Sequence, residues 1–275
     1  MILRISILGG RLVGIAPAFY NSAVSPAKHP PILNIAAYRF VPLSGLPALR
    51  QQLFDAAQAH GLKGTVLLAE EGINLCLAGP ETAVAAWLAL LQADARLADL
   101  RPKHSWSGVP PFQRLKVKIK REIIRMNLPT VRPAAGRAPA LSASTLARWI
   151  GQGADDAGRP LLLLDTRNDF EVDAGAFAGA VDWRLAKFSD FPAALAAHRE
   201  ALAGHTVVSY CTGGIRCEKA ALLLQDSGLG DSCRSYQLDG GILQYFEDTG
   251  GQAPGWVGHC FVFDARTGLD STLRA

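Results

Sequence analysis

A cysteine followed, after a four-residue loop, by an arginine is the feature of this sequence that most directly indicates chemistry. Residues 210–220 read YCTGGIRCEKA, so Cys211 leaves an apolar run and Arg216 opens a helical segment. The glycines at 213 and 214 allow the backbone to curl tightly because they carry no Cβ. Successive N–H groups in such a curl, with the positive end of the following helix, favour an anion. We therefore expect a thiol with a lowered pKa, which is the nucleophilic form of cysteine, beside the fixed charge of Arg216.

The length of this loop separates two kinds of cysteine chemistry. The active-site loop consists of Thr212, Gly213, Gly214 and Ile215. A cysteine phosphatase has a longer loop, sized for a phosphoryl group, whereas this shorter loop suits a sulfur atom or another small group. We expect Cys211 to be catalytic, as a nucleophile or a persulfide-type cysteine, together with Arg216. A buried cysteine that only packs is the alternative, but it gives no reason for the glycines and the arginine.

Two short apolar runs must position the loop. Residues 161–164 (LLLL) end at Asp165, residues 205–210 (HTVVSY) end at Cys211, and a helix is expected over 217–227. Short, fully apolar strands that alternate with helices predict a parallel sheet covered on both faces. Ligands of such sheets bind beyond the carboxyl ends of the strands. Both Asp165 and Cys211 lie at such ends.

The first half of the chain predicts a ferredoxin-like fold. Its hydrophobic periodicity gives the order strand, helix, strand, strand, helix, strand. The expected strands are 32–40, 65–69, 73–78 and 113–124, and the expected helices are 43–60 and 81–91. The fold class is therefore α/β, with an α+β N-terminal domain and an α/β domain around a central parallel sheet.

Composition indicates where these parts begin and end. Residues 127–140 (NLPTVRPAAGRAPA) hold three prolines and one glycine between periodic segments, which predicts a linker. We expect an N-terminal extension without stable structure at 1–31, domains at 32–126 and 141–260, and a C-terminal tail at 261–275.

The charge of the chain is unevenly distributed. Residues 1–140 contain 17 Lys and Arg against 7 Asp and Glu, whereas residues 141–275 contain 11 against 17. A cationic first half predicts a polyanionic partner.

A lysine row gives this partner a place to bind. Between 115 and 120, apolar residues alternate with lysines, so Leu115, Val117 and Ile119 should face the core and the lysines solvent. Such a row can follow a phosphate backbone, and its binding would depend on salt. The RNA-binding candidates are Arg114, Lys116, Lys118 and Lys120, with Tyr38, Trp106 and Phe112 as candidates for base stacking. The alternative is a solvated strand edge that blocks aggregation.

The remaining patterns predict few additional groups. The five cysteines have neither a disulfide framework nor a Cys-x-x-Cys pair, so we expect no metal site and no disulfide scaffold. No flavin, haem or iron motif is recognisable. No apolar run reaches the roughly 20 residues that cross a bilayer, and Arg11 interrupts the only candidate export signal. We therefore expect the protein to be located in the cytoplasm, where cysteines stay reduced.

Three segments of the second half resemble rhodanese domains. They are the loop at 211–216, the D-x-R-x-x-x-E pattern at 165–171 with Gly179-Ala180 behind it, and LDGGI at 238–242. The resemblance implies the rhodanese fold over about 141–250. We expect Asp165 and Arg167 to support this fold and its loop, or to form an ordinary ion pair at a strand end.

The first half resembles the N-terminal domain of the oxygen-dependent tRNA uridine hydroxylases, which carry a C-terminal rhodanese domain. The matching segments are NIAAYRF at 34–40, GTVLLAEEGIN at 64–74, RLKVKIKREII at 114–124, CTGGIRCEKA at 211–220 and FVFD at 261–264. The sequence departs from many members at Leu75-Cys76, and the Cys-rich tail of longer members is not among its segments.

This resemblance implies hydroxylation of the wobble uridine of tRNA at C5 of the base. Its essential cysteine corresponds to Cys211. Molecular oxygen is the co-substrate, the reductant is unknown, tRNA is the partner, and no protein partner or further cofactor is implied. We expect no metal from a Cys-rich tail.

As a mechanism we expect the Cys211 thiolate to add to C6 of uracil, which makes C5 electron-rich towards oxygen. Arg216 and the loop N–H groups would hold the developing anion. Cys217 takes part in thiol redox chemistry or, as the simpler alternative, packs in the first helical turn. The rival activity is sulfur transfer from a Cys211 persulfide to a thiol or cyanide. A non-enzymatic rival is an RNA-binding regulator whose rhodanese domain is inert.

Overall fold

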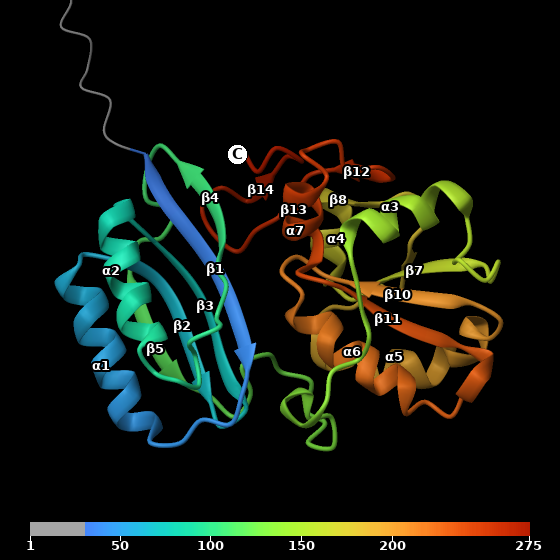
Figure 1. Ribbon diagram of the computed structural model, residues 1–275, viewed down its shortest axis with the longest axis horizontal. Helices are drawn as coiled ribbons and strands as arrows, with labels where there is room; N and C mark the ends of the chain where they lie inside the picture. Colours follow the sequence, from blue (N-terminus) through green and yellow to red (C-terminus); the bar gives the residue numbers. More distant parts are fainter. Residues whose placement is uncertain (1–30) are drawn as a thin grey trace, which may run out of the picture.

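A computed structural model describes residues 31–275 (Figure 1). The expected N-terminal extension therefore lies outside the described residues, except for its last position. The described chain forms two bodies side by side, each built on a five-stranded sheet. Within residues 31–275, no helix has both the length and the apolar character needed to cross a membrane.

The N-terminal body has the order of elements that a ferredoxin-like fold requires, with one strand added. The elements are β1 (Ile32–Phe40), α1 (Leu46–Ala59), β2 (Lys63–Ala69), β3 (Gly72–Gly79), α2 (Glu81–Gln92), β4 (Lys103–Ser107) and β5 (Leu115–Ile119). The sheet order is β4-β1-β3-β2-β5. The pairs among β1 to β4 are antiparallel, and β5 runs parallel to β2.

The closing strand of the ferredoxin-like order is β4, and not the expected segment 113–124. The sequence of β4, KHSWS, lacks the apolar alternation that marks a strand. None of its five residues is fully buried. The expected segment contributes β5 instead, on the opposite edge of the sheet.

The lysine alternation in β5 is present, but its apolar side is less buried than expected. Val117 is buried, Leu115 is half-buried, and Ile119 is 43% exposed. The prediction that all three face the core was therefore wrong for Ile119. The reason is that β5 is an edge strand, with a neighbour on one side only.

Two helices cover one face of this sheet. Leu49, Leu53 and Ala57 recur every four residues along α1, and all three are buried. Trp87 of α2 is fully buried against them, and its indole N–H donates to the carbonyl oxygen of Leu53 at 3.1 Å. Burial of each large side chain stabilises the fold by about 1.5–3 kcal/mol. The opposite face of the sheet is left for the second body.

The C-terminal body is a parallel sheet covered on both faces, as expected. Its helices are α3 (Ala143–Gln152), α4 (Asp169–Ala174), α5 (Phe191–His198), α6 (Ile215–Gln225) and α7 (Gly241–Asp248). Its strands are β6 (Ala140–Leu141), β7 (Leu161–Asp165), β8 (Gly175–Phe177), β9 (Val181–Asp182), β10 (Thr206–Tyr210), β11 (Arg234–Leu238), β12 (Trp256–Gly258), β13 (Cys260–Phe261) and β14 (Gly268–Leu269). Short 3₁₀ turns occur at Pro133–Ala135, Phe188–Asp190, Arg199–Leu202 and Gly230–Ser232.

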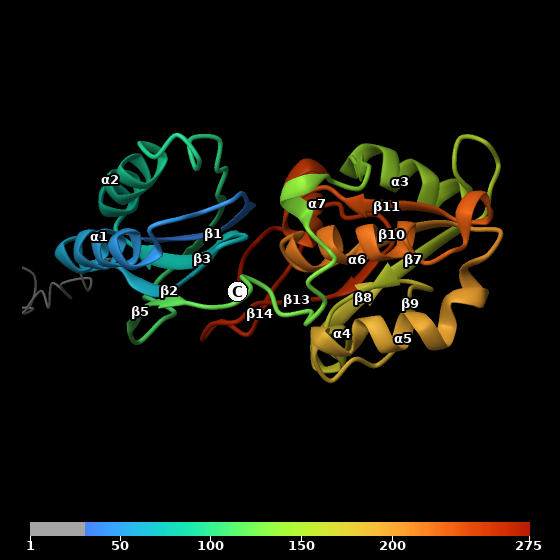
Figure 2. The same cartoon turned by 90° about the horizontal axis from the view of Figure 1, so that it is seen from below.

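The central sheet has the order β6-β11-β10-β7-β9, with every pair parallel. One core lies between the sheet and α3 with α7, and a second lies between the sheet and α5 with α6. Figure 2 shows α3 and α5 on opposite sides of β7 and β10. The strand β10 is buried along its whole length and ends at Tyr210. The next residue, Cys211, therefore lies at the carboxyl edge of the sheet.

The two bodies meet at the first turns of α6. Lys219 is 1% exposed, and its ammonium lies 2.8 Å from a carboxylate oxygen of Glu71 and 2.8 Å from one of Glu122. It also donates to the carbonyl oxygen of Ile124 at 3.1 Å. All three acceptors belong to the first body or to the segment just after its last strand. A buried lysine of the second body is therefore neutralised by the first.

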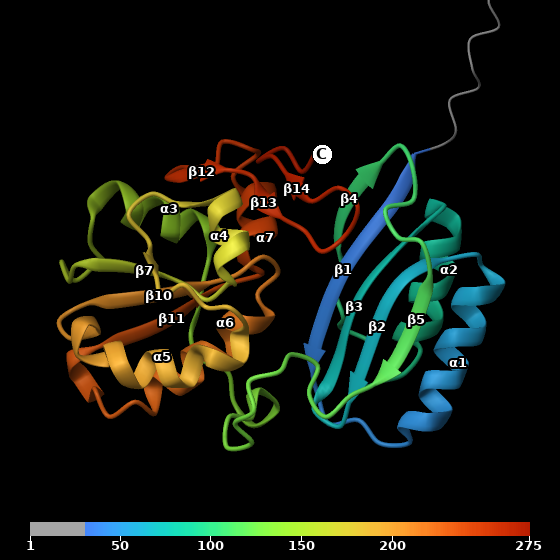
Figure 3. The same cartoon turned by 180° about the vertical axis from the view of Figure 1, so that it is seen from behind.

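The chain also returns to the first body near its C-terminal end. Arg266 donates to Ser105 Oγ at 2.7 Å, and the main-chain N–H of Ala265 donates to the carbonyl oxygen of Pro111 at 3.1 Å. Figure 3 shows this segment beside β4. The bodies are thus held together at two separate places.

Replacement of Lys219 tests the first of these contacts. The Lys219→Ala change should lower the free energy of unfolding by about 2–3 kcal/mol. This loss is smaller than the one expected on breaking a fully buried ion pair, because both carboxylates keep some contact with water. Urea denaturation measures this loss. Lys63→Ala, at an exposed lysine of β2, is the control and should change stability by less than about 0.5 kcal/mol. Equal losses in the two variants would contradict the interpretation.

Candidate active site between the two domains

Cys211 lies at the bottom of a cavity between the two bodies. The cavity has a volume of about 610 Å³. The first body lines it with side chains of β1, β2, β3 and β4, among them Tyr38 and Lys103, and the second body lines it with the loop that follows β10. The Cys211 residue has no exposed surface of its own. The cavity is thus closed from two sides, with the sulfur beneath the loop.

The loop 212–215 is held by its carbonyl groups. The carbonyl oxygens of Cys211 and Thr212 accept from the main-chain N–H groups of Ile242 and Leu243, at 2.9 and 3.1 Å, in the first turn of α7. Gly241 must be a glycine here, because its φ is +70° and a Cβ would lie 2.4 Å from the Cys211 carbonyl oxygen. With these two carbonyls turned to α7, the loop directs the N–H of Gly214 to the Cys211 sulfur.

The sulfur of Cys211 is surrounded by hydrogen-bond donors. The main-chain N–H of Gly214 donates to it at 3.2 Å, and the Cys217 sulfur lies 4.0 Å away. Burial by itself would raise the pKa of this thiol, but the Cys217 hydrogen bond, the Arg216 charge and main-chain N–H groups outweigh it and lower the pKa to about 5. Cys211 is therefore a thiolate at neutral pH.

Arg216 is not a free charge in this site. Its two terminal nitrogens lie 2.6 and 2.7 Å from the two carboxylate oxygens of Glu171, and both side chains are buried. Glu171 is the last residue of the D-x-R-x-x-x-E pattern, but the pattern alone does not predict its bidentate pair with Arg216. The pair fixes the guanidinium next to the loop, and it offsets most of its charge towards a ligand.

Asp165 and Arg167 lie behind the loop rather than in the cavity. They form a fully buried pair, with Arg167 Nη2 2.6 Å from Asp165 Oδ2 and 2.6 Å from the carbonyl oxygen of Gly175. Arg167 also donates to the carbonyl oxygen of Glu171 at 3.2 Å. The pair thereby holds the short helix α4, which carries the partner of Arg216.

Lys103 is a cavity residue that the sequence reasoning missed. It lies on β4, the strand without an apolar pattern, and lines the cavity with Cys211. A Cβ added to Gly240 would lie 3.3 Å from the Cε of Lys103, so this side chain lies against the turn that holds the Cys211 carbonyl. No carboxylate of residues 31–275 lies within ion-pair distance of it. Burial lowers its pKa, although the negative charge at Cys211 opposes this.

The lysine row lies on the same face of the N-terminal sheet as the cavity. In the parallel pairing of β2 with β5, Lys116 is opposite Thr65 and Lys118 is opposite Leu67. Thr65 and Leu67 line the cavity, and partners in register point to the same face. Arg114, Lys116, Lys118 and Lys120 are all exposed, and two further exposed cations, Arg125 and Lys187, line the cavity itself. The cavity thus has a basic rim.

The three aromatic candidates have different surroundings. The Tyr38 hydroxyl donates to Glu218 at 2.8 Å, so this ring is tied to α6. Phe112 lines the cavity, and Trp106 is 43% exposed on β4. The sequence did not single out Phe263, which is 61% exposed, lines the cavity, and has the Arg216 guanidinium 6.0 Å from its ring centre.

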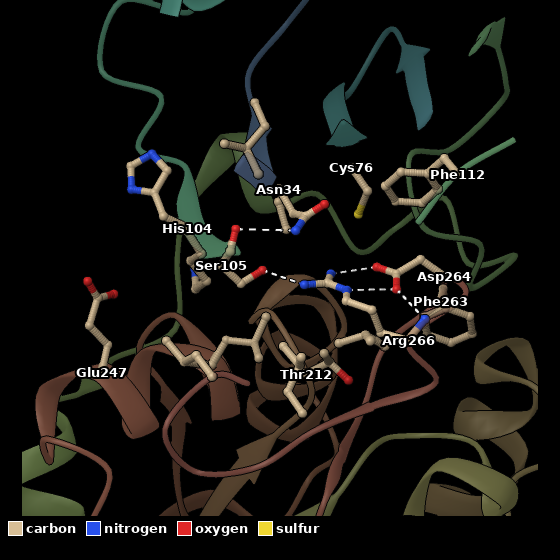
Figure 4. A pocket seen from close by; sticks show the side chains of 17 residues that line it. Asn34, Cys76, His104, Ser105, Phe112, Thr212, Glu247, Phe263, Asp264 and Arg266 are labelled. Atoms are coloured by element: carbon tan, nitrogen blue, oxygen red, sulfur yellow. Dashed lines mark hydrogen bonds and ion pairs between the residues drawn. The ribbon is translucent and has the colours of Figure 1, made fainter. Parts of the chain in front are cut away.

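A smaller cavity of about 80 Å³ adjoins the first one, beneath the returning C-terminal segment (Figure 4). Asp264 holds Arg266 at 2.6 Å, and Arg266 reaches Ser105 of β4. Cys76 lines both cavities, and burial raises its pKa to about 11, so it is a neutral thiol. The returning segment closes one side of the site and positions Phe263.

Comparisons with known proteins agree with this two-body arrangement. Residues 32–123 match the model of the UPF0176 acylphosphatase-like domain, and residues 142–248 match the rhodanese-like domain. A tRNA uridine(34) hydroxylase of Bordetella petrii is 61% identical over 244 residues, which cover 89% of this chain and 95% of that protein. Proteins of the same name from Delftia acidovorans and Variovorax paradoxus are each 59% identical, covering 88% and 89% of this chain and 90% and 91% of theirs.

The chain belongs to the tRNA uridine(34) hydroxylase family. The family resemblance expected from the sequence is thereby confirmed, as is the α/β fold class. Among residues 31–275 there is no group of three or more His, Cys, Asp or Glu side chains placed to hold a metal ion. The charged side chains that line the cavity are Cys211, Lys103, Arg125, Lys187 and Arg216, which pairs with Glu171.

The ionisation of Cys211 is directly measurable. Thiolate absorbance near 240 nm, taken as the wild-type minus Cys211→Ser difference, should titrate with a midpoint near pH 5. The folded-state pKa lies below that of a free thiol, about 8.5, so the thiolate is present from neutral pH down to that midpoint. Cys76→Ser should leave the difference spectrum unchanged. A midpoint above pH 8 would show that the donors around the sulfur do not ionise it.

Proposed function

We propose that this protein hydroxylates the uridine at position 34 of tRNA at C5 of the base, with molecular oxygen as co-substrate and Cys211 as nucleophile. The observation that carries the proposal is an ionised sulfur at the bottom of a cavity whose other wall belongs to a cationic domain. A volume of about 610 Å³ is in the range of small-molecule sites. Bases of single-stranded loops can be splayed out into such a pocket.

The nucleophilic step is an addition to the pyrimidine ring. The Cys211 sulfur forms a bond to C6, and the electron pair of the C5=C6 bond moves towards C5 and the O4 carbonyl. The developing anion needs a positive group that is not already neutralised. Lys103 fits this role better than Arg216, because Arg216 is held by Glu171 and Lys103 has no carboxylate partner among residues 31–275. Anion binding by Arg216 and the loop N–H groups, as expected from the sequence, stays a prediction, and we propose Lys103 as a further group for this role.

The oxygen step consumes electrons as well as oxygen. Conversion of C5–H to C5–OH by O₂ releases one molecule of water and requires two electrons and two protons from a donor. The proposal assigns no resident cofactor to this step. Thr212 and the glycines are proposed to support the loop and to position the sulfur and its donors, and the catalytic role expected for Arg216 stays a prediction.

Sulfur transfer from a Cys211 persulfide is the alternative activity, since a four-residue loop also accommodates a second sulfur atom. The names of the related proteins do not favour it. A basic rim also attracts small anions such as thiosulfate, so the names of the related proteins, and not the rim, favour the hydroxylase.

The basic rim is proposed to bind the tRNA backbone. Lys116 and Lys118 project from the cavity face of the sheet, Arg125 and Lys187 line the opening, and Arg114 and Lys120 flank the row. A tRNA substrate and five free cysteines support a cytoplasmic location.

The activity is tested on unmodified tRNA under oxygen with a thiol reductant. Wild-type protein should form 5-hydroxyuridine at position 34, measured by mass spectrometry of nucleosides. Cys211→Ser should lose it by at least about 1,000-fold, as expected when a nucleophile is removed. Lys103→Met should lower kcat by about 10²-fold with KM little changed, because a transition-state charge loses its partner. Undiminished product from Cys211→Ser would refute the mechanism, and rapid thiosulfate turnover without tRNA product would favour the rival.

The tRNA interface is tested by the salt dependence of binding. A Lys116→Ala/Lys118→Ala variant should lower the slope of log K against log salt by about 1.4–1.8, if each lysine neutralises one phosphate. The control is Arg148→Ala/Arg199→Ala, which removes the same charge from exposed positions of the C-terminal body. An equal change in both variants would mean that only net charge matters and that the row is not a contact.

A further inference from the structure

We propose that Cys217 is the second redox-active residue of the site, and that the Cys211–Cys217 dithiol supplies the two electrons which the hydroxylation consumes. This inference rests on the proposed function and deepens it. It would give the reaction a built-in two-electron donor that an external thiol restores after each turnover.

The geometry places the two sulfurs next to each other. Cys217 lies in the first turn of α6, directly behind the loop that begins with Cys211, and the sulfur atoms are 4.0 Å apart. Both residues have no exposed surface. A disulfide bond is about 2 Å long, so its formation requires an approach of about 2 Å, which side-chain rotation beside the glycine loop can supply.

No other cysteine of the described chain is placed in this way. Cys76 lies across the cavity on β3, Cys260 lies on β13, and Cys233 precedes β11. None of the three has a sulfur contact with Cys211, whereas Cys217 does. The pairing is therefore specific to position 217.

The two thiols are also in different protonation states, which suits a nucleophile and its resolving partner. The pKa of Cys211 is lowered to about 5, whereas burial and the neighbouring Cys211 charge raise that of Cys217 well above its ordinary value. The Cys217 sulfur also lies 2.9 Å from the carbonyl oxygen of Gly214, so its single S–H has two alternative acceptors, this carbonyl and the Cys211 thiolate. Cys211 thus attacks, and Cys217 keeps its hydrogen until a second step needs it.

After Cys211 has added to C6, the electron pair at C5 forms a bond to O₂, and protonation gives a C5 hydroperoxide. Loss of the C5 proton then expels Cys211 and restores the C5=C6 bond. The thiolate next attacks the outer peroxide oxygen, which breaks the O–O bond and leaves 5-hydroxyuridine and a sulfenic acid on Cys211.

Cys217 completes the sequence. Its sulfur displaces the sulfenic oxygen, which leaves as water, and a disulfide forms. In sum, uridine, O₂ and two thiols give 5-hydroxyuridine, water and one disulfide. An external thiol that enters the cavity attacks at Cys211, because Cys217 lies behind it, and regenerates the dithiol by exchange.

The test is a single turnover of the full-length protein without reductant. Reduced protein is freed of small thiols, mixed with unmodified tRNA in air, and quenched with an alkylating agent. We expect about one 5-hydroxyuridine per protein together with a Cys211–Cys217 disulfide in the peptide map. The same mixture without tRNA should keep both thiols over the same time. Product formation with both thiols retained would overturn the proposal, and this readout needs no variant.

Variants give a second, independent test. Cys217→Ser and Cys217→Ala should still form about one 5-hydroxyuridine per protein in a single turnover, because the Cys211 thiolate alone reduces the peroxide, but they should leave a Cys211 sulfenic acid in place of the disulfide. In repeated turnovers with limiting thiol they should complete less than about a tenth of the wild-type cycles, and excess dithiothreitol should restore turnover because it resolves the sulfenic acid instead. Cys233→Ser, at a cysteine that lies outside both cavities, should behave as wild type. Wild-type dependence on external thiol in both Cys217 variants would overturn the assignment. Absence of product from wild type even in excess dithiothreitol would refute the proposed function itself, and with it this inference.

Discussion

The buried charges at the start of α6 must be neutralised, and this constraint joins the two bodies and the site into one structure. Lys219 has almost no contact with water and lies between Glu71 and Glu122, while Glu218 is bound by Tyr38 and Arg137. An unpaired charge in such a position costs several kcal/mol. The helix that begins at the reactive loop can therefore adopt this environment only when the N-terminal body is docked against it. The same turns also carry Arg216 and Cys217.

This coupling determines which charges the cavity presents. Within the C-terminal body, the cation nearest the loop is held by Glu171, so the loop offers main-chain N–H groups rather than a free guanidinium. Lys103, which has no carboxylate partner among residues 31–275, comes from β4 of the other body. The rhodanese-like fold alone therefore provides an ionised sulfur, but the charge that faces it across the cavity depends on docking. Because the docked domain supplies this charge, the same loop type can carry out different chemistries when different domains are docked against it.

The sequence predicted the loop, the parallel sheet and the lysine row, because each has a local pattern: an apolar run that ends at Cys211, glycines in a turn, and strict alternation from Leu115. It could not predict what depends on contacts between distant segments. β4 has no apolar alternation, so both the strand and its Lys103 were missed. The pairs of Glu171 with Arg216 and of Tyr38 with Glu218 join residues 45 and 180 positions apart. Sequence patterns relate only residues a few positions apart, so they do not predict these pairs. The groups come together only in the folded and docked chain.

The path by which a base reaches the sulfur follows from the glycines of the loop. At Gly214 a Cβ would lie 2.9 Å from the Tyr38 hydroxyl, and at Gly241 it would meet the Cys211 carbonyl, so both sides are filled. At Gly213, which lines the cavity, a Cβ would meet no atom within 4 Å. Tyr38 of the N-terminal body therefore closes the Gly214 side of the loop, and the loop's own carbonyl fills the Gly241 side. The Gly213 side faces the cavity with open space beside it, so a base that enters the cavity meets the loop there.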